Sequence, residues 1–346
     1  MRLLAVHPGA TWATQDVHTG LVAGLRAGGH DVIEYALSGR LARSAQWFQY
    51  IARQDHDAGF TKPYSAADVQ YHASQGLLER ALRFEVDWVL VICGAYLHPD
   101  ILLLARRAGL RLAAVFTESP YDDVHQARVA PLYDVCFTNE RCSVAPLRAA
   151  NPQTFYLPAG YDPAAHGATA NGQHAGKPGH DVVFVGTAFG SRLALLSAVD
   201  WSGIDLGLYG HWALQPGDPL YPFAHDGVVD NARAGALYRH ARIGLNLYRE
   251  PPLCDGLPVA AESLNPRAYE LAADGVLTLS TPRAEVGEKF GDAVPTFTTA
   301  GELGALVRHH LAHPNGVGQN LRALVAEDTY HHRAAQLVAY LEDWRQ

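Results

Sequence analysis

The segment 262–276 carries the residues best suited to hold an anion. Pro266 suits the first turn of a helix, which makes Asn265 the expected N-cap. The amino end of a helix is partly positive, and Arg267 could add a bidentate contact to the same phosphate. Glu270, one turn later on the same face, could accept two hydrogen bonds from a ribose diol. This spacing fits a nucleoside diphosphate, although a capped surface helix with an Arg–Glu pair explains the same residues equally well.

The first half of the chain offers three candidates for acid–base work. Asp16 and His18 follow the first predicted strand, and either could take a proton from an acceptor hydroxyl. Asp16 is equally well placed as an ordinary carboxylate at a helix start. Glu118 follows another strand on a loop that contains a proline, so it ranks first, with a loop salt bridge as the alternative. The loop after the first strand is not GxGxxG, which argues against a dinucleotide enzyme.

Basic and aromatic residues alternate between positions 40 and 71. An acceptor platform would use such rings to stack on a sugar or base while arginines contact phosphate. An amphipathic helix whose aromatic residues belong to the core is the simpler interpretation. The residues concerned are Arg40, Arg43, Trp47, Phe48, Tyr50, Arg53, Phe60, Lys62, Tyr64 and Tyr71.

The sequence does not predict a metal site. His309 and His313 stand four residues apart and His331 and His332 are adjacent, but no third ligand has matching spacing. The four cysteines form no CxxC pair, so neither zinc binding nor a disulfide framework is indicated.

Short apolar strands alternate with amphipathic helices in both halves of the chain, the pattern of parallel sheets covered on both faces. We therefore predict an α/β protein with two Rossmann-like domains and a cleft between them at the carboxyl ends of the strands. The predicted divisions are a first domain at 1–160, a Gly/Pro/His-rich linker at 161–178, a second domain at 179–325 and a helix at 326–346 that packs back on the first domain.

Composition narrows the classes of function. The length of 346 residues suits two domains, and 48% hydrophobic residues provide material for two cores. The net charge of −8 disfavours nonspecific nucleic-acid binding, so a DNA acceptor is conceivable but not favoured. No apolar run reaches the ~18 residues of a membrane span, and the amino terminus lacks a secretory apolar region, so a cytoplasmic location is expected.

Several segments resemble one family of enzymes. SLNPRAYELAADG resembles the S-x-N-x-R-x-x-E-x-x-x-x-G motif of GT-B glycosyltransferases related to the spore maturation protein CgeB. FVGTAFGSR, LYGHW and ALYRHARIGLNLYR resemble, in order, other parts of that family's donor domain, and TESPYD and YLPAGYD resemble turns of its first domain. The resemblance covers most of residues 80–300.

The resemblance implies that 1–160 is the acceptor-side domain and that 179–325 binds a nucleotide-sugar donor, expected to be a UDP-sugar, with no metal or other cofactor. The separation of Glu262 and Glu270 equals the E-x7-E pattern of retaining GT-B enzymes, which would place Glu262 near the sugar while leaving stereochemistry open. In FVGTAFGSR, the resemblance places Gly186, Thr187 and Arg192 beside the phosphates, although a glycine after a strand is commonly just part of a turn. In LYGHW, it places Gly210, His211 and Trp212 beside the base, although a core tryptophan is an equally good explanation.

We therefore predict a glycosyltransferase that moves a sugar from a nucleotide sugar to a hydroxyl acceptor, which could be a small molecule, a glycan or a modified nucleic-acid base. A nucleotide-sugar 2-epimerase is the enzymatic alternative because it shares the two-domain architecture without needing a second substrate. A sugar-binding protein without turnover is the non-enzymatic alternative.

Overall fold

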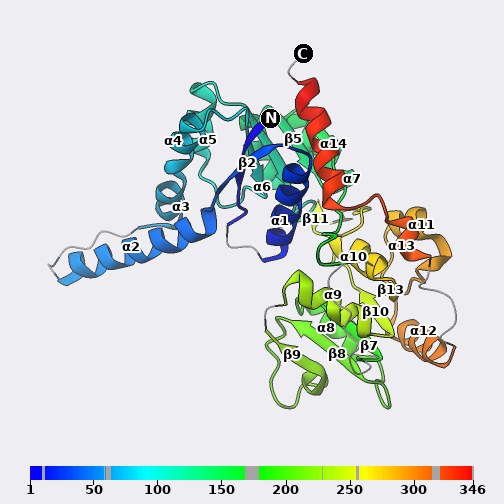
Figure 1. Cartoon of the computed structure of the whole chain (residues 1–346). Helices are drawn as coiled ribbons and strands as arrows, with labels where there is room; N and C mark the ends of the chain where they lie inside the picture. The colour runs from blue at the N-terminus through cyan, green and yellow to red at the C-terminus, as the bar shows by residue number, and fades with distance from the viewer. Residues whose placement is uncertain are drawn as a thin grey trace. The chain divides into compact units, whose positions relative to one another are not determined.

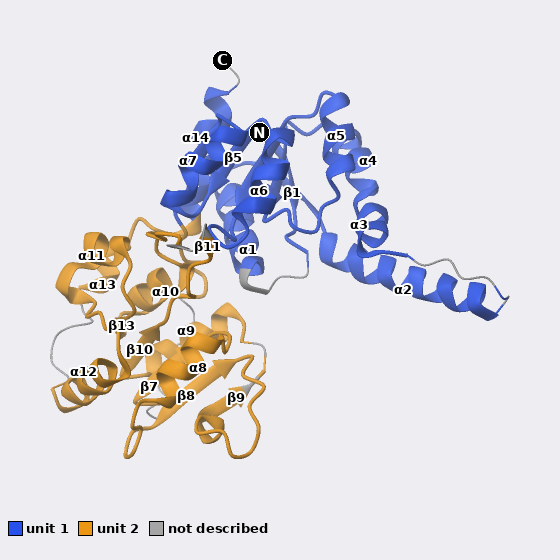
Figure 2. Cartoon of the chain, turned by 180° about the vertical axis from the view of Figure 1, so that it is seen from behind, with its two compact units in different colours: residues 1–158, 331–346 blue, residues 159–330 orange. Residues whose placement is uncertain are grey.

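The computed structural model describes residues 1–9, 12–57, 59, 64–167, 179–227, 229–254, 257–313 and 320–344. The chain divides into two compact units (Figure 2). Unit 1 contains residues 1–158 and 331–346, and unit 2 contains residues 159–330.

Unit 1 is built on a six-stranded parallel sheet with the order β2-β1-β3-β4-β5-β6. The strands β3 and β4 are buried along their whole length, as expected where helices cover both faces of a parallel sheet. The strands are β1 (Arg2–Val6), β2 (Asp31–Tyr35), β3 (Trp88–Ile92), β4 (Leu112–Phe116), β5 (Val135–Thr138) and β6 (Thr154–Tyr156).

The helices of unit 1 bury alternate strand residues. Leu4 and Val6 belong to one core with Leu77 and Ile101, because side chains alternate between the faces of a strand. Tyr340 of the last helix stacks on Phe155 with a ring-centroid distance of 4.5 Å, so the carboxyl-terminal helix packs on this unit (Figure 1). The helices are α1 (Trp12–Ala27), α2 (Leu37–Asp57), α3 (Ala66–Ser74), α4 (Gly76–Arg83), α5 (Pro99–Arg107), α6 (Asp123–Val129), α7 (Arg141–Ala150) and α14 (Tyr330–Asp343).

Unit 2 is built on a five-stranded parallel sheet with the order β13-β10-β7-β8-β9. Its strands are β7 (Val182–Val185), β8 (Leu206–Gly210), β9 (Ala224–Asp226), β10 (Ile243–Asn246) and β13 (Leu277–Ser280), and β11 (Leu253–Cys254) pairs with β12 (Leu257–Pro258) in a small antiparallel ribbon. Its helices are α8 (Gly190–Ser197), α9 (Asn231–His240), α10 (Pro266–Asp274), α11 (Ala284–Phe290), α12 (Ala300–Ala312) and α13 (Leu321–Leu324).

The predicted α/β class with two Rossmann-like parallel sheets is confirmed. Two local expectations differ from the structure. The region 42–71 includes most of α2 and part of α3, but Trp47 and Tyr50 are exposed there, so the aromatic residues that the simpler interpretation assigned to a core do not all belong to one. Residues 161–167 were expected to be linker, yet Tyr161, Ala165 and His166 are buried in unit 2. The rest of that predicted linker, residues 168–178, lies outside the described part of the chain.

Candidate functional site

Helix α10 begins and ends where local sequence requires. Asn265 Oδ1 accepts a hydrogen bond from Ala268 N at 3.1 Å, Pro266 occupies the first turn, and Gly275 closes the helix in the left-handed region at φ 69°. Asn265 Nδ2 also donates to Asn246 Oδ1 at 3.0 Å. The start of α10 is thereby fixed to the carboxyl end of β10, at the edge of a parallel sheet where ligands bind in open α/β folds.

The cap also limits what the helix start offers to an anion. Pro266 has no N–H, and the N–H of Ala268 is already used by Asn265. Attraction at this end therefore comes from the helix dipole and from side chains more than from a cradle of main-chain donors.

Arg267 and Glu270 form an ion pair on the same face of α10. Arg267 Nη1 lies 2.5 Å from Glu270 Oε2, and the guanidinium stands over the Tyr238 ring at 5.2 Å. Glu270 is only 4% exposed. A pentose diol would therefore have to share this carboxylate with Arg267.

Three residues that the sequence interpretation missed support this pair. His166 is completely buried, with Nδ1 at 2.7 Å from Asp274 Oδ2 and Nε2 at 4.0 Å from Glu270 Oε2. Asp274 Oδ1 accepts hydrogen bonds from Arg239 Nη1 at 2.7 Å and from the main chain of Gly167 at 3.0 Å. Burial opposes protonation of His166, but the Glu270 charge and the Asp274 hydrogen bond outweigh it and raise the pKa of the imidazole.

Of these three residues, Asp274 could have been found from its spacing in the sequence. Glu270 and Asp274 are four residues apart and so share a helix face. Nothing local marks His166, which lies 108 residues before Asp274 in a segment that looks like linker.

Glycines allow the first two strands of this sheet to end side by side. A Cβ on Gly210, whose φ is +117°, would lie 2.5 Å from the carbonyl oxygen of Gly186. Gly186 N donates to Tyr209 O at 2.8 Å. Gly210 is thus required by close backbone approach, whereas a Cβ on Gly186 would meet the Phe184 ring at 2.8 Å. The Gly186 N–H is already bonded to the neighbouring strand.

Arg192 donates hydrogen bonds that stabilise the turn after β7. It donates from Nη1 to Thr187 O at 2.9 Å and from Nη2 to Leu247 O at 2.6 Å, and its guanidinium lies 4.9 Å from the centre of the Phe189 ring. Arg192 therefore links the loops that follow β7 and β10. Carbonyl acceptors orient a guanidinium without neutralising its charge.

A cavity of 260 Å³ lies beside Arg192 at the carboxyl ends of β10 and β13, and Arg249 and Arg283 also line it. Arg283 donates to Ala261 O at 2.9 Å and to Arg249 O at 3.1 Å, and it stands 4.8 Å from the Tyr248 ring. The Arg249 guanidinium lies over the Phe189 ring at 5.1 Å. Three oriented guanidinium groups make this cavity suited to phosphate oxygens, although Glu250 also lines it.

The two ring residues predicted to lie beside a base differ in burial. His211 is exposed, whereas Trp212 is 3% exposed and packs edge-on against Phe184 at 5.8 Å. Trp212 belongs to the core of unit 2, so its indole is used for packing in this structure.

Glu262 precedes α10 and is partly exposed. Its carbonyl oxygen accepts a hydrogen bond from Glu285 N at 3.0 Å, while the Glu285 carboxylate accepts one from Leu264 N at 2.8 Å. These bonds hold the loop that carries Glu262 against the start of α11.

In unit 1, Glu118 follows β4 at the carboxyl edge of the sheet. Its carbonyl oxygen accepts hydrogen bonds from Tyr121 N at 2.8 Å and Asp122 N at 3.1 Å, and the side chain is partly exposed. Burial raises the pKa of the neighbouring Asp122 carboxyl. Cys93, at the end of β3, is close enough for the charge of Glu118 to affect its thiol, whose pKa is raised chiefly by burial.

Asp16 and His18 both lie on α1, but their surroundings differ. Asp16 is partly exposed, whereas His18 is 3% exposed, with its ring centroid 4.9 Å from that of His7. Burial and the neighbouring His7 lower the pKa of His18 to about 4, so the ring is neutral near pH 7. Its Nε2 has no hydrogen-bond partner among the described residues and lies 4.0 Å from Glu34 Oε2. The burial of His18 leaves Glu118 and Asp16 as the more accessible bases.

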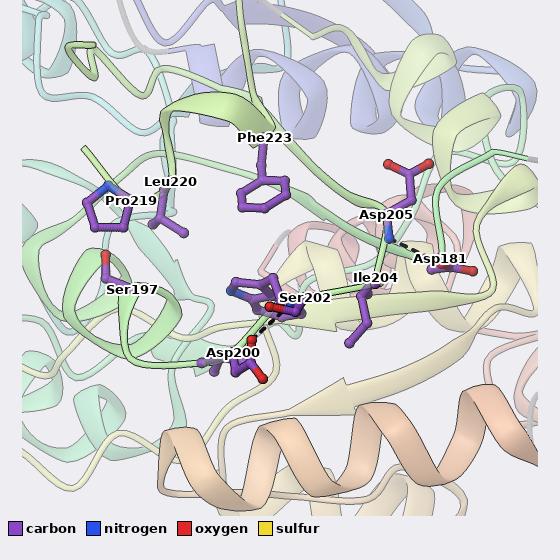
Figure 3. Close-up of a pocket in the computed structure, with 12 residues that line it drawn as sticks. Asp181, Ser197, Asp200, Ser202, Ile204, Asp205, Pro219, Leu220 and Phe223 are labelled. Carbon is purple, nitrogen blue, oxygen red and sulfur yellow. Dashed lines mark hydrogen bonds between the residues drawn. The ribbon is translucent and has the colours of Figure 1, made fainter. Parts of the chain in front are cut away.

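A second cavity in unit 2, of 710 Å³, lies at the opposite edge of the sheet, beside the amino ends of β7 and β8 (Figure 3). Its three acidic side chains already have partners: Asp181 with Arg242 at 3.0 Å, Asp200 with Arg308 at 3.0 Å and Asp205 with His180 at 2.9 Å. This edge is not where parallel sheets of this type bind their ligands, so the arginine-lined cavity is the better candidate.

The described residues provide neither a metal-binding group nor a membrane-spanning helix. No group of three or more His, Cys, Asp or Glu could hold a metal ion there. In the same residues, no helix combines the length and apolarity that crossing a membrane requires.

A known family matches the part of the chain that forms the arginine-lined cavity. Residues 190–339 match the family model described as glycosyl transferase-like. No curated protein sequence matches the chain.

Solved structures share the fold at low sequence identity. Sucrose-phosphate synthase from Thermosynechococcus elongatus has a TM-score of 0.66 at 12% identity, covering 99% of both chains. AviGT4, a glycosyltransferase involved in avilamycin A biosynthesis, has a TM-score of 0.61 at 20% identity over 99% of this chain and 97% of that one. A putative UDP-N-acetylglucosamine 2-epimerase from Listeria monocytogenes has a TM-score of 0.60 at 12% identity, covering 99% and 96%. The fold is therefore GT-B, and the match over residues 190–339 supports a glycosyltransferase.

Proposed function

We propose that the protein transfers a glycosyl group from a nucleotide sugar to a hydroxyl acceptor. The observation that carries the proposal is the arginine-lined cavity at the carboxyl edge of the unit 2 sheet, formed by Arg192, Arg249 and Arg283. It lies largely within the segment that matches the glycosyl transferase-like model. The resemblance to the CgeB-related group remains a prediction.

In this proposal unit 2 binds the donor. The three arginines and Arg267 would stabilise the diphosphate as it leaves, because cations fixed before reaction lower the cost of developing charge. Glu270 would accept from the ribose through the oxygen that Arg267 does not hold. A UDP-sugar is the proposed donor.

Unit 1 would provide the acceptor side. The bond between the anomeric carbon and the diphosphate oxygen breaks, a bond from that carbon to the acceptor oxygen forms, and the acceptor proton passes to a base. Glu118 is the first choice for that base, because it is partly exposed at the carboxyl edge of its sheet. Asp16 and His18 are the alternatives, and Glu262 is proposed to lie near the transferred sugar.

Calorimetric titration with UDP and UDP-sugars tests donor binding. Arg249→Ala and Arg283→Ala should each weaken UDP binding about tenfold or more, since loss of a hydrogen bond to a charged group costs about 1.5–3 kcal/mol. Arg308→Ala is the matched control, because Arg308 pairs with Asp200 beside the other cavity. Unchanged affinity in both cavity variants would refute the assignment of the donor site.

Product analysis with donor alone separates transfer from the epimerase alternative, to which structures such as the Listeria monocytogenes protein draw attention. Transfer requires an acceptor-dependent product together with free nucleoside diphosphate. An isomerised nucleotide sugar formed without acceptor would replace this proposal with the epimerase. Tight binding with no product under any condition would favour a sugar-binding protein.

A further inference from the structure

His166 connects the segment before β7 to the two helices that flank the candidate nucleotide site. It is completely buried in unit 2, in contact with residues of α9 and α10. Its main-chain N–H donates to Asp162 O at 2.9 Å, and the next N–H, of Gly167, donates to Asp274 Oδ1 at 3.0 Å. These bonds fix the position of the imidazole ring relative to α10.

Both ring nitrogens of His166 face oxygen atoms. Nδ1 lies 2.7 Å from Asp274 Oδ2. Nε2 lies 3.4 Å from Asn231 Oδ1 and 4.0 Å from Glu270 Oε2. A neutral imidazole has a single N–H and would direct a lone pair at one of these groups, whereas an imidazolium has a donor for each side. The geometry therefore fits the protonated ring.

The charges around the ring act on this protonation. Burial disfavours the charged ring and so does the Arg267 charge, but the charge of Glu270 and the hydrogen bond and charge of Asp274 outweigh both and raise the pKa of His166. The titratable and charged side chains around the ring are Arg267, Glu270 and Asp274 of α10, Tyr238 and Arg239 of α9, and Tyr161 of the preceding segment.

The orientation of the Glu270 carboxylate depends on this ring. Arg267 and His166 both lie beside Oε2, so two cations attract the same oxygen. Oε1 is the oxygen that neither cation holds. Because Asp274 retains the Nδ1 proton, deprotonation removes the proton from Nε2 and leaves a lone pair facing Oε2. The carboxylate is then no longer held on that side.

We propose that His166 is a positioning residue for ribose recognition: its imidazolium holds Glu270 so that Oε1 accepts hydrogen bonds from the ribose diol of the donor. The inference rests on the proposed function and adds that the preference for a ribose is linked to a buried proton. His166 is completely buried, so it acts through Glu270 and does not itself touch the ribose or the reacting atoms.

The expected effect is confined to the ribose. Loss of a hydrogen bond to a charged acceptor weakens binding about tenfold or more. The cavity lined by Arg192, Arg249 and Arg283, where the diphosphate is proposed to bind, does not include His166. The ribose preference should be complete below pH 6.5 and should be lost as pH rises through the raised pKa of His166.

The test is calorimetric titration of the full chain with UDP, 2′,3′-dideoxy-UDP and pyrophosphate between pH 6 and 9. At pH 6 UDP should bind about tenfold more tightly than the dideoxy nucleotide, and this ratio should fall toward one as pH rises. Both nucleotides carry the same diphosphate, so the titration of the diphosphate itself cancels in the ratio. Pyrophosphate has no ribose and reports on the diphosphate site alone.

Two substitutions separate the two sides of the ring. His166→Asn places an amide where Nδ1 stands, so it can keep the contact with Asp274 while losing the group that faces Glu270. It should lower the affinity for UDP to that of the dideoxy nucleotide at every pH and leave pyrophosphate binding unchanged. His166→Gln extends a neutral donor toward Glu270, so it should restore the preference for UDP and remove its dependence on pH.

His180→Asn is the matched control. His180 is also in unit 2, with Nδ1 at 2.9 Å from Asp205 Oδ1 and Nε2 at 2.8 Å from Tyr209 OH. Both of its ring nitrogens thus have partners, as in His166, but neither faces Glu270. This variant should keep the wild-type ratio at each pH.

Three results would overturn the inference. They are a wild-type ratio that does not change with pH, a wild-type ratio in His166→Asn, and equal loss of UDP and pyrophosphate affinity in that variant, which would mean that the residue only maintains the fold of the site. If the wild type binds neither nucleotide nor pyrophosphate, the proposed function itself fails. Pyrophosphate binding with equal affinity for the two nucleotides would preserve the diphosphate site and remove only the role of His166.

Discussion

Replacing Asp274 with alanine removes the centre of the buried charge cluster in unit 2. The Asp274 carboxylate is fully buried and accepts from Arg239 at 2.7 Å, His166 at 2.7 Å and Gly167 N at 3.0 Å. Without it the Arg239 and His166 side chains lose their nearest anion, and breaking a buried ion pair costs about 3–5 kcal/mol. For a unit of this size 1 kcal/mol corresponds to about 2–4 °C, so the expected fall in Tm is about 6–20 °C.

Differential scanning calorimetry measures this change, and UDP titration of the same variant reports whether Arg267 and Glu270 have moved. Asp200→Ala is the control, because Asp200 makes an exposed pair with Arg308 and its loss should leave the transition within error. A fall of less than 2 °C in Asp274→Ala would show that the cluster does not stabilise the unit and would refute the reasoning.

Three further predictions follow from single contacts. Gly210→Ala should weaken UDP binding and lower Tm, because its Cβ would meet the Gly186 carbonyl at 2.5 Å in a backbone with φ +117°; an unchanged calorimetric profile and affinity would contradict this. The pKa of His18 is depressed from 6.5 to about 4, so the neutral ring stabilises the folded state above pH 6.5. This stabilisation, roughly 3 kcal/mol in total, is lost as pH falls toward 4. An ordinary histidine pKa in an NMR titration would disprove the prediction. The pKa of His166 is raised above 6.5, so protonated His166 contributes fully to the free energy of unfolding below pH 6.5, and this contribution is lost as pH rises through the folded pKa. Denaturation measured from pH 6 to 9 should show this fall in stability in the wild type and not in His166→Asn.

The local features of the candidate site could be predicted from the sequence. Asn265, Pro266 and Gly275 fix the ends of α10 through short-range geometry, so the helix and its cap follow from neighbouring residues. The alternation of apolar runs and amphipathic helices likewise determined the α/β class, since parallel strands buried on both faces need continuous apolar residues.

Other outcomes depended on contacts between distant segments. Trp212 comes directly after the exposed His211, yet packing against Phe184 makes it part of the core. Arg192 was expected to meet phosphate, and the structure shows it also joining two loops through the carbonyls of Thr187 and Leu247. Arg249 ends the segment ALYRHARIGLNLYR without an assigned role and Arg283 lies outside the quoted segments, and only the neighbouring ends of β10 and β13 bring them to one cavity.

The sequence by itself therefore determined the helix ends, the strand pattern and the Arg267–Glu270 spacing, because each depends on residues within one or two turns. Only the tertiary structure decided that His166 meets Asp274 across 108 residues and that Trp47 and Tyr50 remain exposed on α2. Burial and pairing of a side chain are set by what the rest of the chain places beside it, and no local pattern contains that information.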